Sequence, residues 1–268
     1  MTLPTRMVEK PWGKDSLPAP FHAPDGQRIG EVWFEPPAQL PDLLVKYIFT
    51  SEKLSVQVHP SDAQTLHSGL GRQGKEECWL VIAADEGAQL GIGFNQPVDA
   101  ATMRSAAVDG SIEGMMTWFP VKPGDFFYIP ANTVHAIGAG VSLIEVQQNS
   151  DITYRLYDYG RPRDLHLDDG MTVAKGEVYA DPRQRHVAPR GEIALVDGPL
   201  FRLTRYDGPL SPQAHHAFSS GPLLVVPVEG EAVLGDQTVA AGQCAAVQAA
   251  ADIRLSPGNK GLIAQPLR

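Results

Sequence analysis

The chain has 268 residues, of which 43% are hydrophobic and 20% charged, an ordinary globular composition with room for one large domain or two small ones. Its net charge is −9 and it has no basic block, which argues against binding to nucleic acid or to a membrane surface. Two cysteines make no disulfide framework, and no apolar leader or membrane-spanning run occurs, so we expect a cytoplasmic protein.

Short apolar runs separated by glycine and proline predict many short strands in the first half of the chain. Leu54–His59 alternates between apolar and polar residues, as a strand with one buried face does. Ser61–Leu70 begins with Ser-Asp and predicts a short capped helix. Residues 77–84 and 89–94 predict the two strands of a hairpin that turns at residues 85–87.

The remaining sequence predicts one irregular helical stretch and further short strands. Residues 97–115 are expected to be helical, and other strands are predicted at 43–49, 126–129, 133–137, 141–147 and 152–158. The strand and turn rhythm returns after a segment rich in proline, aspartate, arginine and histidine. We therefore predict a mainly β fold with two β-barrel units and a few short helices, divided into residues 1–165, a linker or covering segment at 166–190, and residues 191–268.

Four side chains have the chemistry of a metal site. Gln57 and His59 are two residues apart on a predicted strand and therefore project from the same face. Glu77 opens another strand, and His135 follows a Gly-x5-Pro turn over residues 124–130. Imidazole nitrogens, a carboxylate and an amide oxygen suit Zn²⁺ or a similar divalent ion. Spacing alone leaves open the alternative that these are ordinary polar strand residues.

A resemblance to a known family extends over about the first 160 residues, as judged from the order and the amino-acid sequences of several motifs. The chain resembles type I mannose-6-phosphate isomerases of the short bacterial form, members of the cupin superfamily, in the stretches KPWG (Lys10–Gly13), LSVQVHPSD (Leu54–Asp62), GKEECW (Gly74–Trp79), GDFFYIPANTVHAIGAG (Gly124–Gly140) and IEVQQNSDITYRLYDYGR (Ile144–Arg161). The resemblance implies that the two β units are cupin-type jelly rolls.

The activity that the resemblance implies is a zinc-dependent aldose–ketose isomerisation. It would interconvert mannose 6-phosphate and fructose 6-phosphate through a cis-enediol, with a small phosphorylated sugar as the partner and one Zn²⁺ per chain. Two alternatives stay open: an isomerase for another sugar or sugar phosphate, and a cupin that binds a sugar without turning it over. The sequence leaves the catalytic base and the oligomeric state undetermined.

The resemblance also implies the roles of individual residues. The implied zinc ligands are Gln57, His59, Glu77 and His135. The resemblance places Arg155 in the active site, Ser55, Lys46 and Lys75 near the phosphosugar, and Glu145 by the pocket. We take Arg155, Lys75 and Glu145 as the catalytic candidates, and Ser55, Lys46, Arg161 and Asp151 as the substrate-binding candidates. Asp151 joins this set because it shares a strand face with Thr153 and Arg155.

Some features depart from the family or fall outside the predicted site. The long helical domain of larger members is absent, and Arg161 stands where the family often has lysine six residues after the arginine. An arginine can still pair with a phosphate, but its high pKa makes it unsuited to proton transfer. Cys78 should face the core, and the adjacent His215 and His216 are expected in a loop. The second β unit has no ligand set and is predicted to be free of metal.

Overall fold

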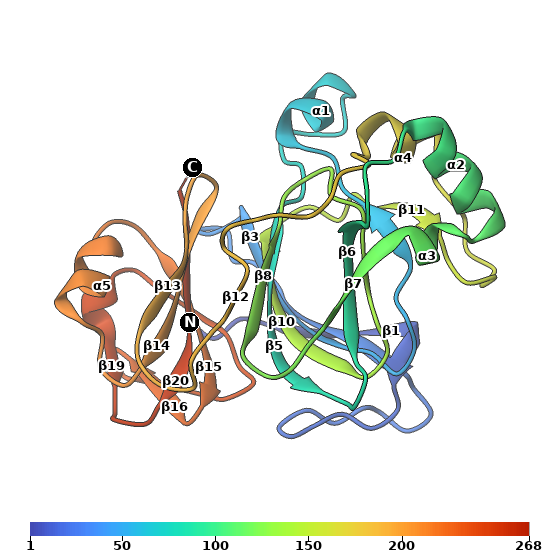
Figure 1. Ribbon diagram of the computed structural model, residues 1–268. Coiled ribbons are helices and arrows are strands. Elements are labelled where there is room, and N and C mark those ends of the chain that lie inside the picture. The colour runs from blue at the N-terminus through green and yellow to red at the C-terminus, as the bar shows by residue number, and fades with distance from the viewer. Residues whose placement is uncertain (268) are drawn as a thin grey trace.

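The computed structural model describes residues 1–267, which form two β-rich lobes lying side by side (Figure 1). The larger lobe contains the strands between residues 5 and 186 and carries four short helices at one end, whereas the smaller lobe contains the C-terminal strands. The prediction of a mainly β chain with a few short helices is confirmed. Within residues 1–267, no helix is both long enough and apolar enough to span a membrane.

The larger lobe consists of short strands and turns, as the spacing of glycine and proline predicts. Its strands are β1 (Thr5–Lys14), β2 (Ile29–Phe34), β3 (Leu43–Phe49), β4 (Val56–Val58), β5 (Glu77–Ala84), β6 (Gln89–Phe94), β7 (Met116–Pro120), β8 (Asp125–Ile129), β9 (His135–Ile137), β10 (Val141–Gln148), β11 (Tyr154–Tyr157) and β12 (Arg185–His186). Its helices are α1 (Asp62–His67), α2 (Ala100–Asp109), α3 (Ile112–Met115) and α4 (Leu167–Val173).

The smaller lobe repeats this pattern with shorter elements. Its strands are β13 (Ile193–Asp197), β14 (Phe201–Asp207), β15 (Leu223–Glu229), β16 (Glu231–Leu234), β17 (Gln237–Ala240), β18 (Ala245–Val247), β19 (Ile253–Leu255) and β20 (Lys260–Pro266). The helix α5 (Pro212–Ala217) and a single 3₁₀ turn, η1 (Ala250–Asp252), complete it.

The strands of each lobe are divided between two sheets. In the larger lobe the orders are β1-β2-β3-β10-β5-β8-β12 and β11-β4-β9-β6-β7, and in the smaller lobe β13-β14-β20-β15-β18 and β17-β16-β19. Every ladder pairs its strands antiparallel. The strands that carry the predicted metal ligands are central in their sheets, which gives those side chains a rigid support.

The predicted helices form where local capping signals favour them. At α1 the Ser61 hydroxyl accepts the backbone N–H of Gln64, and the Gln64 side chain accepts the Ser61 N–H. Residues 97–115 form α2 and α3, with Asp99 capping α2 and Gly110 ending it at a φ of 84°. A left-handed backbone conformation of this kind favours glycine.

The prediction of a hairpin between residues 77–84 and 89–94 is wrong. Both strands form, but β5 pairs with β10 and β8, whereas β6 pairs with β7 and β9 in the other sheet. Both edges of β5 are thus already occupied, so the turn after β5 carries the chain across to the second sheet. A turn signal marks where the chain reverses but does not determine which strands become neighbours.

The prediction of a loop at His215 and His216 is also wrong, because both residues lie in the last turn of α5. Ser211 caps this helix and Pro212 occupies its first turn, a combination that starts helices well. Histidine near a helix C-terminus is favoured by the helix dipole.

A shared apolar core connects the two lobes. One cluster of buried residues includes Phe126 and Tyr128 from the larger lobe and Phe201 and Leu224 from the smaller one. The rings of Tyr128 and Phe201 stack with their centroids 5.9 Å apart. The division at 1–165, 166–190 and 191–268 stays a prediction; its middle segment supplies α4, which packs on β11, and β12, which pairs with β8.

Candidate metal centre and active site

Three ligand-capable side chains converge in the interior of the larger lobe. The donor atoms of His59, Glu77 and His135 lie within 4.8 Å of one another, and all three residues are buried. Glu77 begins β5, His135 begins β9, and His59 directly follows β4. The two sheets of the larger lobe therefore both contribute to this cluster.

Hydrogen bonds fix the orientation of both imidazoles. His59 Nδ1 lies 2.9 Å from the carbonyl oxygen of Ile152, and His135 Nδ1 lies 2.9 Å from that of Thr133. A carbonyl oxygen only accepts hydrogen bonds, so each Nδ1 carries the proton and each Nε2 presents its lone pair to the cluster. Histidines that bind metal ions are commonly oriented through their second nitrogen in this way.

Gln57 completes the group that strand alternation predicts. Its side-chain Nε2 lies 3.2 Å from His135 Nε2 and 3.5 Å from His59 Nε2. The oxygen and nitrogen of a glutamine amide are distinguished by their hydrogen-bond network, and a rotated amide presents its oxygen to the same point. Gln57 pairs directly with His135 across β4 and β9, so the sheet register brings the two residues together.

The charges of the cluster match a divalent cation. Burial lowers the pKa of His59 well below its ordinary value and that of His135 to about 4, so both rings are neutral at pH 7. Burial and the nearby Glu145 raise the pKa of Glu77 to about 7. Glu77 Oε1 lies 3.3 Å from His135 Nε2 and accepts no hydrogen bond from residues 1–267. Two lone pairs facing each other in the interior are stabilised by a cation between them, so these residues fit Zn²⁺.

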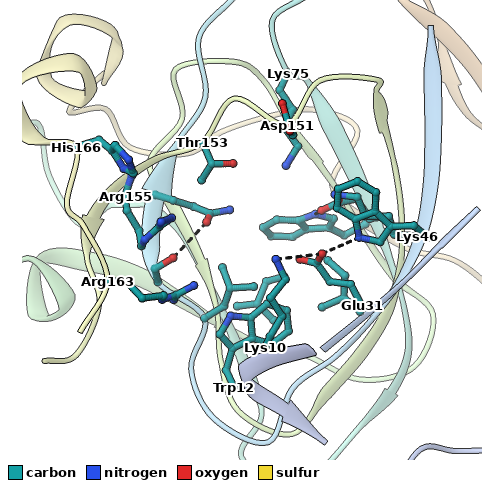
Figure 2. Close-up of a pocket in the computed structure, with 18 residues that line it drawn as sticks. Lys10, Trp12, Glu31, Lys46, Lys75, Asp151, Thr153, Arg155, Arg163 and His166 are labelled. Atoms are coloured by element: carbon teal, nitrogen blue, oxygen red, sulfur yellow. Dashed lines mark hydrogen bonds and ion pairs between the residues drawn. The ribbon is translucent and has the colours of Figure 1, made fainter. Parts of the chain in front are cut away.

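A cavity of about 420 Å³ opens beside this cluster (Figure 2). It lies between the two sheets of the larger lobe. Seven of the candidates predicted from sequence line it, namely Lys46, Ser55, Gln57, Lys75, Glu145, Asp151 and Arg155. Lys75 connects the cavity to the cluster, because its Nζ lies 2.6 Å from Glu77 Oε2 and 3.1 Å from His59 Nε2.

Among the catalytic and substrate-binding candidates, Arg161 is the one that does not line the cavity. Its guanidinium instead forms ion pairs with Asp158, at 3.1 Å, and with Glu52, at 3.0 Å. Several other lining residues were not site candidates from the sequence, among them Lys10, Trp12, Glu31, Trp33, Arg163 and His166. The KPWG stretch contains the first two of these, but the pairing that brings β1 and β2 over the cavity is long-range and leaves no local signal.

Glu145 is a buried carboxylate held by two donors. Lys46 Nζ lies 3.2 Å from its Oε1, and the indole N–H of Trp79 donates to Oε2 at 3.0 Å. Burial acts to raise the pKa of this carboxyl, but Lys75 and Lys46 outweigh it and lower the value to about 2. Glu145 is thus ionised at neutral pH, and its charge faces the cavity.

Arg155 brings a fixed positive charge next to the cluster. It pairs with Gln57 across β11 and β4, so the sheet register sets it beside a predicted metal ligand. Burial and the neighbouring Arg163 lower its pKa, although an arginine remains charged at any physiological pH. Its Nε is buried and has no hydrogen-bond partner among residues 1–267. An unused guanidinium in a cavity is suited to an anion or an oxyanion.

Comparison with known proteins supports the resemblance noted in the motifs. The chain is 39% identical to the mannose-6-phosphate isomerase of Streptococcus mutans over 173 residues, which are 61% of this chain and 54% of that protein. It is 36% identical to the mannose-6-phosphate isomerase ManA of Bacillus subtilis over 201 residues, which are 70% of this chain and 62% of that protein. The match thus spans less than two thirds of either relative. No protein-family model matches the chain.

Solved structures share the fold along nearly the whole chain. The crystal structure of the mannose 6-phosphate isomerase from Bacillus subtilis has a TM-score of 0.82 at 24% identity and covers 98% of each chain. A zinc-bound mannose 6-phosphate isomerase has a TM-score of 0.70 at 15% identity, over 99% of this chain and 98% of the other. At identities this low, the structural similarity shows the fold alone. It confirms the predicted fold class.

Proposed function

Because the chain is related in sequence to mannose-6-phosphate isomerases and shares their fold, we propose that it interconverts mannose 6-phosphate and fructose 6-phosphate. The observation that carries this proposal is the buried group of His59, Glu77 and His135 beside a cavity that presents both acidic and basic side chains. A sugar phosphate needs such a mixture, since its hydroxyls, carbonyl and phosphate each require different partners.

The proposed cofactor is one Zn²⁺ per chain, held by Gln57, His59, Glu77 and His135. Two neutral imidazoles with oriented lone pairs, a buried carboxylate and an amide support this choice. When bound, the ion would polarise the oxygens at C1 and C2 of the sugar. The zinc in a structure of the same fold supports this choice of metal.

The reaction that we propose moves one proton between neighbouring carbons. A base removes the proton from C2, and the electrons of that C–H bond form the C1–C2 double bond of a cis-enediol while O1 gains a proton. The O2 hydroxyl then loses its proton as the C2 carbonyl forms, and a proton is returned to C1. Residues 1–267 hold a single cluster of three or more metal-ligating side chains, whereas a hydride shift typically calls for a carboxylate-rich site with two metals. This supports the proton route.

Three residues of the cavity are assigned to these proton and charge transfers. Glu145 and Lys75 are the candidates for moving the proton, because each has a charged atom at the cavity wall and a fixed partner behind it. Arg155 would stabilise the negative charge on the sugar oxygen, since it lines the cavity and pairs with Gln57 across β11 and β4. Ser55, Lys46 and Asp151 line the same cavity and are assigned to contacts with the substrate.

The direct test is a coupled assay for fructose 6-phosphate with zinc-loaded protein. Mannose 6-phosphate should be the preferred substrate in a panel that includes other sugar phosphates and free sugars. Preference for another sugar would assign a different isomerase activity, and saturable binding without turnover would identify a sugar-binding protein.

A second experiment tests the chemical route. Isomerisation in D₂O should place deuterium on the carbon that receives the hydrogen, because an enediol exchanges with solvent through its base. Product without deuterium would favour a hydride shift, once direct transfer by a shielded base has been excluded. Arg155→Ala should lose most of kcat while retaining its zinc, and an active variant would remove Arg155 from the mechanism.

The proposed location is the cytoplasm. Cys78 and Cys244 are free and buried, which is compatible with a reducing compartment.

A further inference from the structure

The Asp158 carboxylate accepts hydrogen bonds from two arginines, Arg161 and Arg163. This carboxylate is 2% exposed and follows directly after β11. Arg163 donates to it twice, from Nε and from Nη2, each at 2.6 Å, while Arg161 donates once from Nη1 at 3.1 Å. A two-pronged contact of this kind fixes the plane of a guanidinium more tightly than a single hydrogen bond.

The two arginines therefore present their remaining donors to different surroundings. Arg161 uses Nη2 for Glu52, at 3.0 Å, and does not line the cavity. Arg163 lines the cavity, and within residues 1–267 its side-chain hydrogen bonds go to Asp158 through Nε and Nη2. Its Nη1 is thus available to a ligand, and Figure 2 shows Arg163 on the same side of the cavity as Arg155 and His166.

Two guanidinium groups that face one cavity attract an anion into it, in addition to the carboxylate of Asp158. Burial and Arg163 lower the pKa of Arg155, whereas Asp158 and Asp164 act to raise it, so two cations and two carboxylates act on this part of the cavity. The carboxylates that line the cavity are engaged elsewhere: Glu31 with Lys10 and Trp33, and Glu145 with Lys46 and Trp79. Asp151 projects from another side of the cavity together with Lys75 (Figure 2).

We propose that Arg163, oriented by Asp158, binds the phosphate group of the sugar phosphate. This inference rests on the proposed function, and it replaces Arg161 as the phosphate-binding residue that the family resemblance implies. Arg155 pairs with Gln57, a predicted metal ligand, across β11 and β4, and it remains assigned to the sugar oxygens. The phosphate accepts from Arg163 Nη1, and Asp158 acts as a positioning residue.

The test compares Arg163→Gln with Arg161→Gln and with a matched control. Arg104→Gln serves as the control, because Arg104 forms its ion pair with Asp168 at 2.6 Å, does not line the cavity and comes from α2. The ligands are sorbitol 6-phosphate, which has no carbonyl group and is not isomerised, and sorbitol. Binding to each zinc-loaded protein is measured by calorimetry, alongside kcat and KM for mannose 6-phosphate.

Arg163→Gln should weaken sorbitol 6-phosphate binding by about tenfold or more, which corresponds to about 1.4 kcal/mol, the scale of one charge-assisted hydrogen bond. It should raise KM for mannose 6-phosphate by a similar factor and change kcat much less, because the phosphate is bound equally before and during the reaction. Arg161→Gln and Arg104→Gln should bind the ligand as the unmodified protein does. Unchanged affinity in Arg163→Gln, or a loss seen in Arg161→Gln instead, would overturn the proposal.

Arg163→Lys keeps the experiment decisive if the glutamine variant fails to fold. Lysine retains the charge but cannot contact Asp158 with two donors, so its affinity should be intermediate; full affinity would overturn the inference. The outcomes also separate the two proposals. Turnover of mannose 6-phosphate that is indifferent to Arg163 overturns only the subsite, whereas Arg163-dependent binding without turnover overturns only the isomerase. A protein that does neither overturns both.

Discussion

His166 and Arg155 bind each other through two hydrogen bonds that run in opposite directions. The backbone N–H of His166 donates to the carbonyl oxygen of Arg155 at 2.7 Å, and the backbone N–H of Arg155 donates to His166 Nδ1 at 3.1 Å. The Nδ1 atom can accept only when it carries no proton, so in this arrangement the neutral ring is protonated at Nε2. His166 thereby connects the loop after β11 to the strand that carries Arg155.

Replacement of His166 by leucine should lower both stability and activity. The leucine removes the acceptor for the Arg155 N–H, and an unpaired, partly buried N–H group costs about 1–3 kcal/mol. Because the same bond holds the backbone of Arg155, kcat should fall as well. Denaturant unfolding and steady-state kinetics with mannose 6-phosphate measure the two effects.

His166→Asn provides the matched comparison for this prediction. The asparagine Oδ1 can accept a hydrogen bond from nearly the position of the imidazole Nδ1. Stability should therefore recover more fully in the asparagine variant than in the leucine variant. If the leucine variant has the same unfolding midpoint and kcat as the unmodified protein, the hydrogen bond to His166 Nδ1 has no role in holding Arg155.

Zinc should stabilise the folded chain in proportion to its saturation. An ion that binds only the native state contributes about 2.7 kcal/mol when its free concentration is one hundred times Kd. We expect Tm to fall on chelation and to recover when zinc is added. His135→Ala should abolish this increment because it removes one of the oriented nitrogens.

The control for the zinc effect is His186→Ala. His186 is exposed on β12 and pairs with Asp125 at 2.8 Å, away from the buried cluster. Its replacement should leave the zinc-dependent rise in Tm intact. Equal loss of the rise in both histidine variants would point to nonspecific binding and against the cluster as the metal site.

Trp79 connects the predicted metal site with the Glu145 carboxylate. Its N–H donates to Glu145, and its ring meets that of His135 edge-on with centroids 5.4 Å apart. Trp79→Phe keeps an aromatic ring and removes the donor to a charged group, which is worth about 1.5–3 kcal/mol. We therefore expect kcat to fall by roughly tenfold or more.

Trp118→Phe is a matched control, since it also removes an indole donor. Trp118 donates to the carbonyl oxygen of Glu113 at 3.0 Å and does not line the cavity. Its kcat should remain close to that of the unmodified protein. If Trp79→Phe retains full kcat with zinc bound, Glu145 does not depend on the indole for its position.

The residues proposed as metal ligands could be singled out from the sequence because the signals involved are local. Gln57 and His59 follow from strand alternation, and the burial of Val56 and Val58 on the opposite face agrees with that pattern. The burial of Cys78 next to Glu77 follows from the same rule. The family motifs then added Glu77 and His135 to Gln57 and His59. The proximity of these four side chains depends on strands that are far apart in the chain.

The loop side chains could not be predicted on the same basis. Arg163 and His166 lie between β11 and α4, where no periodicity relates sequence to direction. Whether Arg161 or Arg163 enters the cavity depends on how the chain turns around Asp158. The wrong hairpin has a similar origin, because the partners of β5 are chosen by the whole sheet.

Both cysteines should resist thiol reagents in the native protein. Cys78 and Cys244 are buried, and burial raises the pKa of each thiol, so the reactive thiolate is scarce even at about pH 9. Labelling with a colorimetric disulfide reagent should be slow in native buffer and rapid in denaturant. Fast native labelling of either cysteine would contradict this burial.

Because the two lobes share a core, a destabilising substitution in the smaller lobe should also lower the stability of the larger lobe. Phe201 is fully buried and stacks on Tyr128 across the two lobes, so Phe201→Ala should cost about 3–5 kcal/mol. The four tryptophans of the chain all lie in the larger lobe, within β1, β2, β5 and β7. Their fluorescence therefore reports unfolding of the lobe that does not contain the substitution.

If the lobes unfold together, the urea midpoint measured by tryptophan fluorescence should shift in Phe201→Ala by the same amount as the midpoint measured by circular dichroism. Phe218→Ala is the matched comparison, because Phe218 is equally buried but belongs to a cluster confined to the smaller lobe. In cooperative unfolding Phe218→Ala should also shift the tryptophan midpoint, by an amount set by its own loss of stability, because all probes then report one transition. A tryptophan midpoint that neither substitution moves would mean that the lobes unfold independently and that the common core does not couple them.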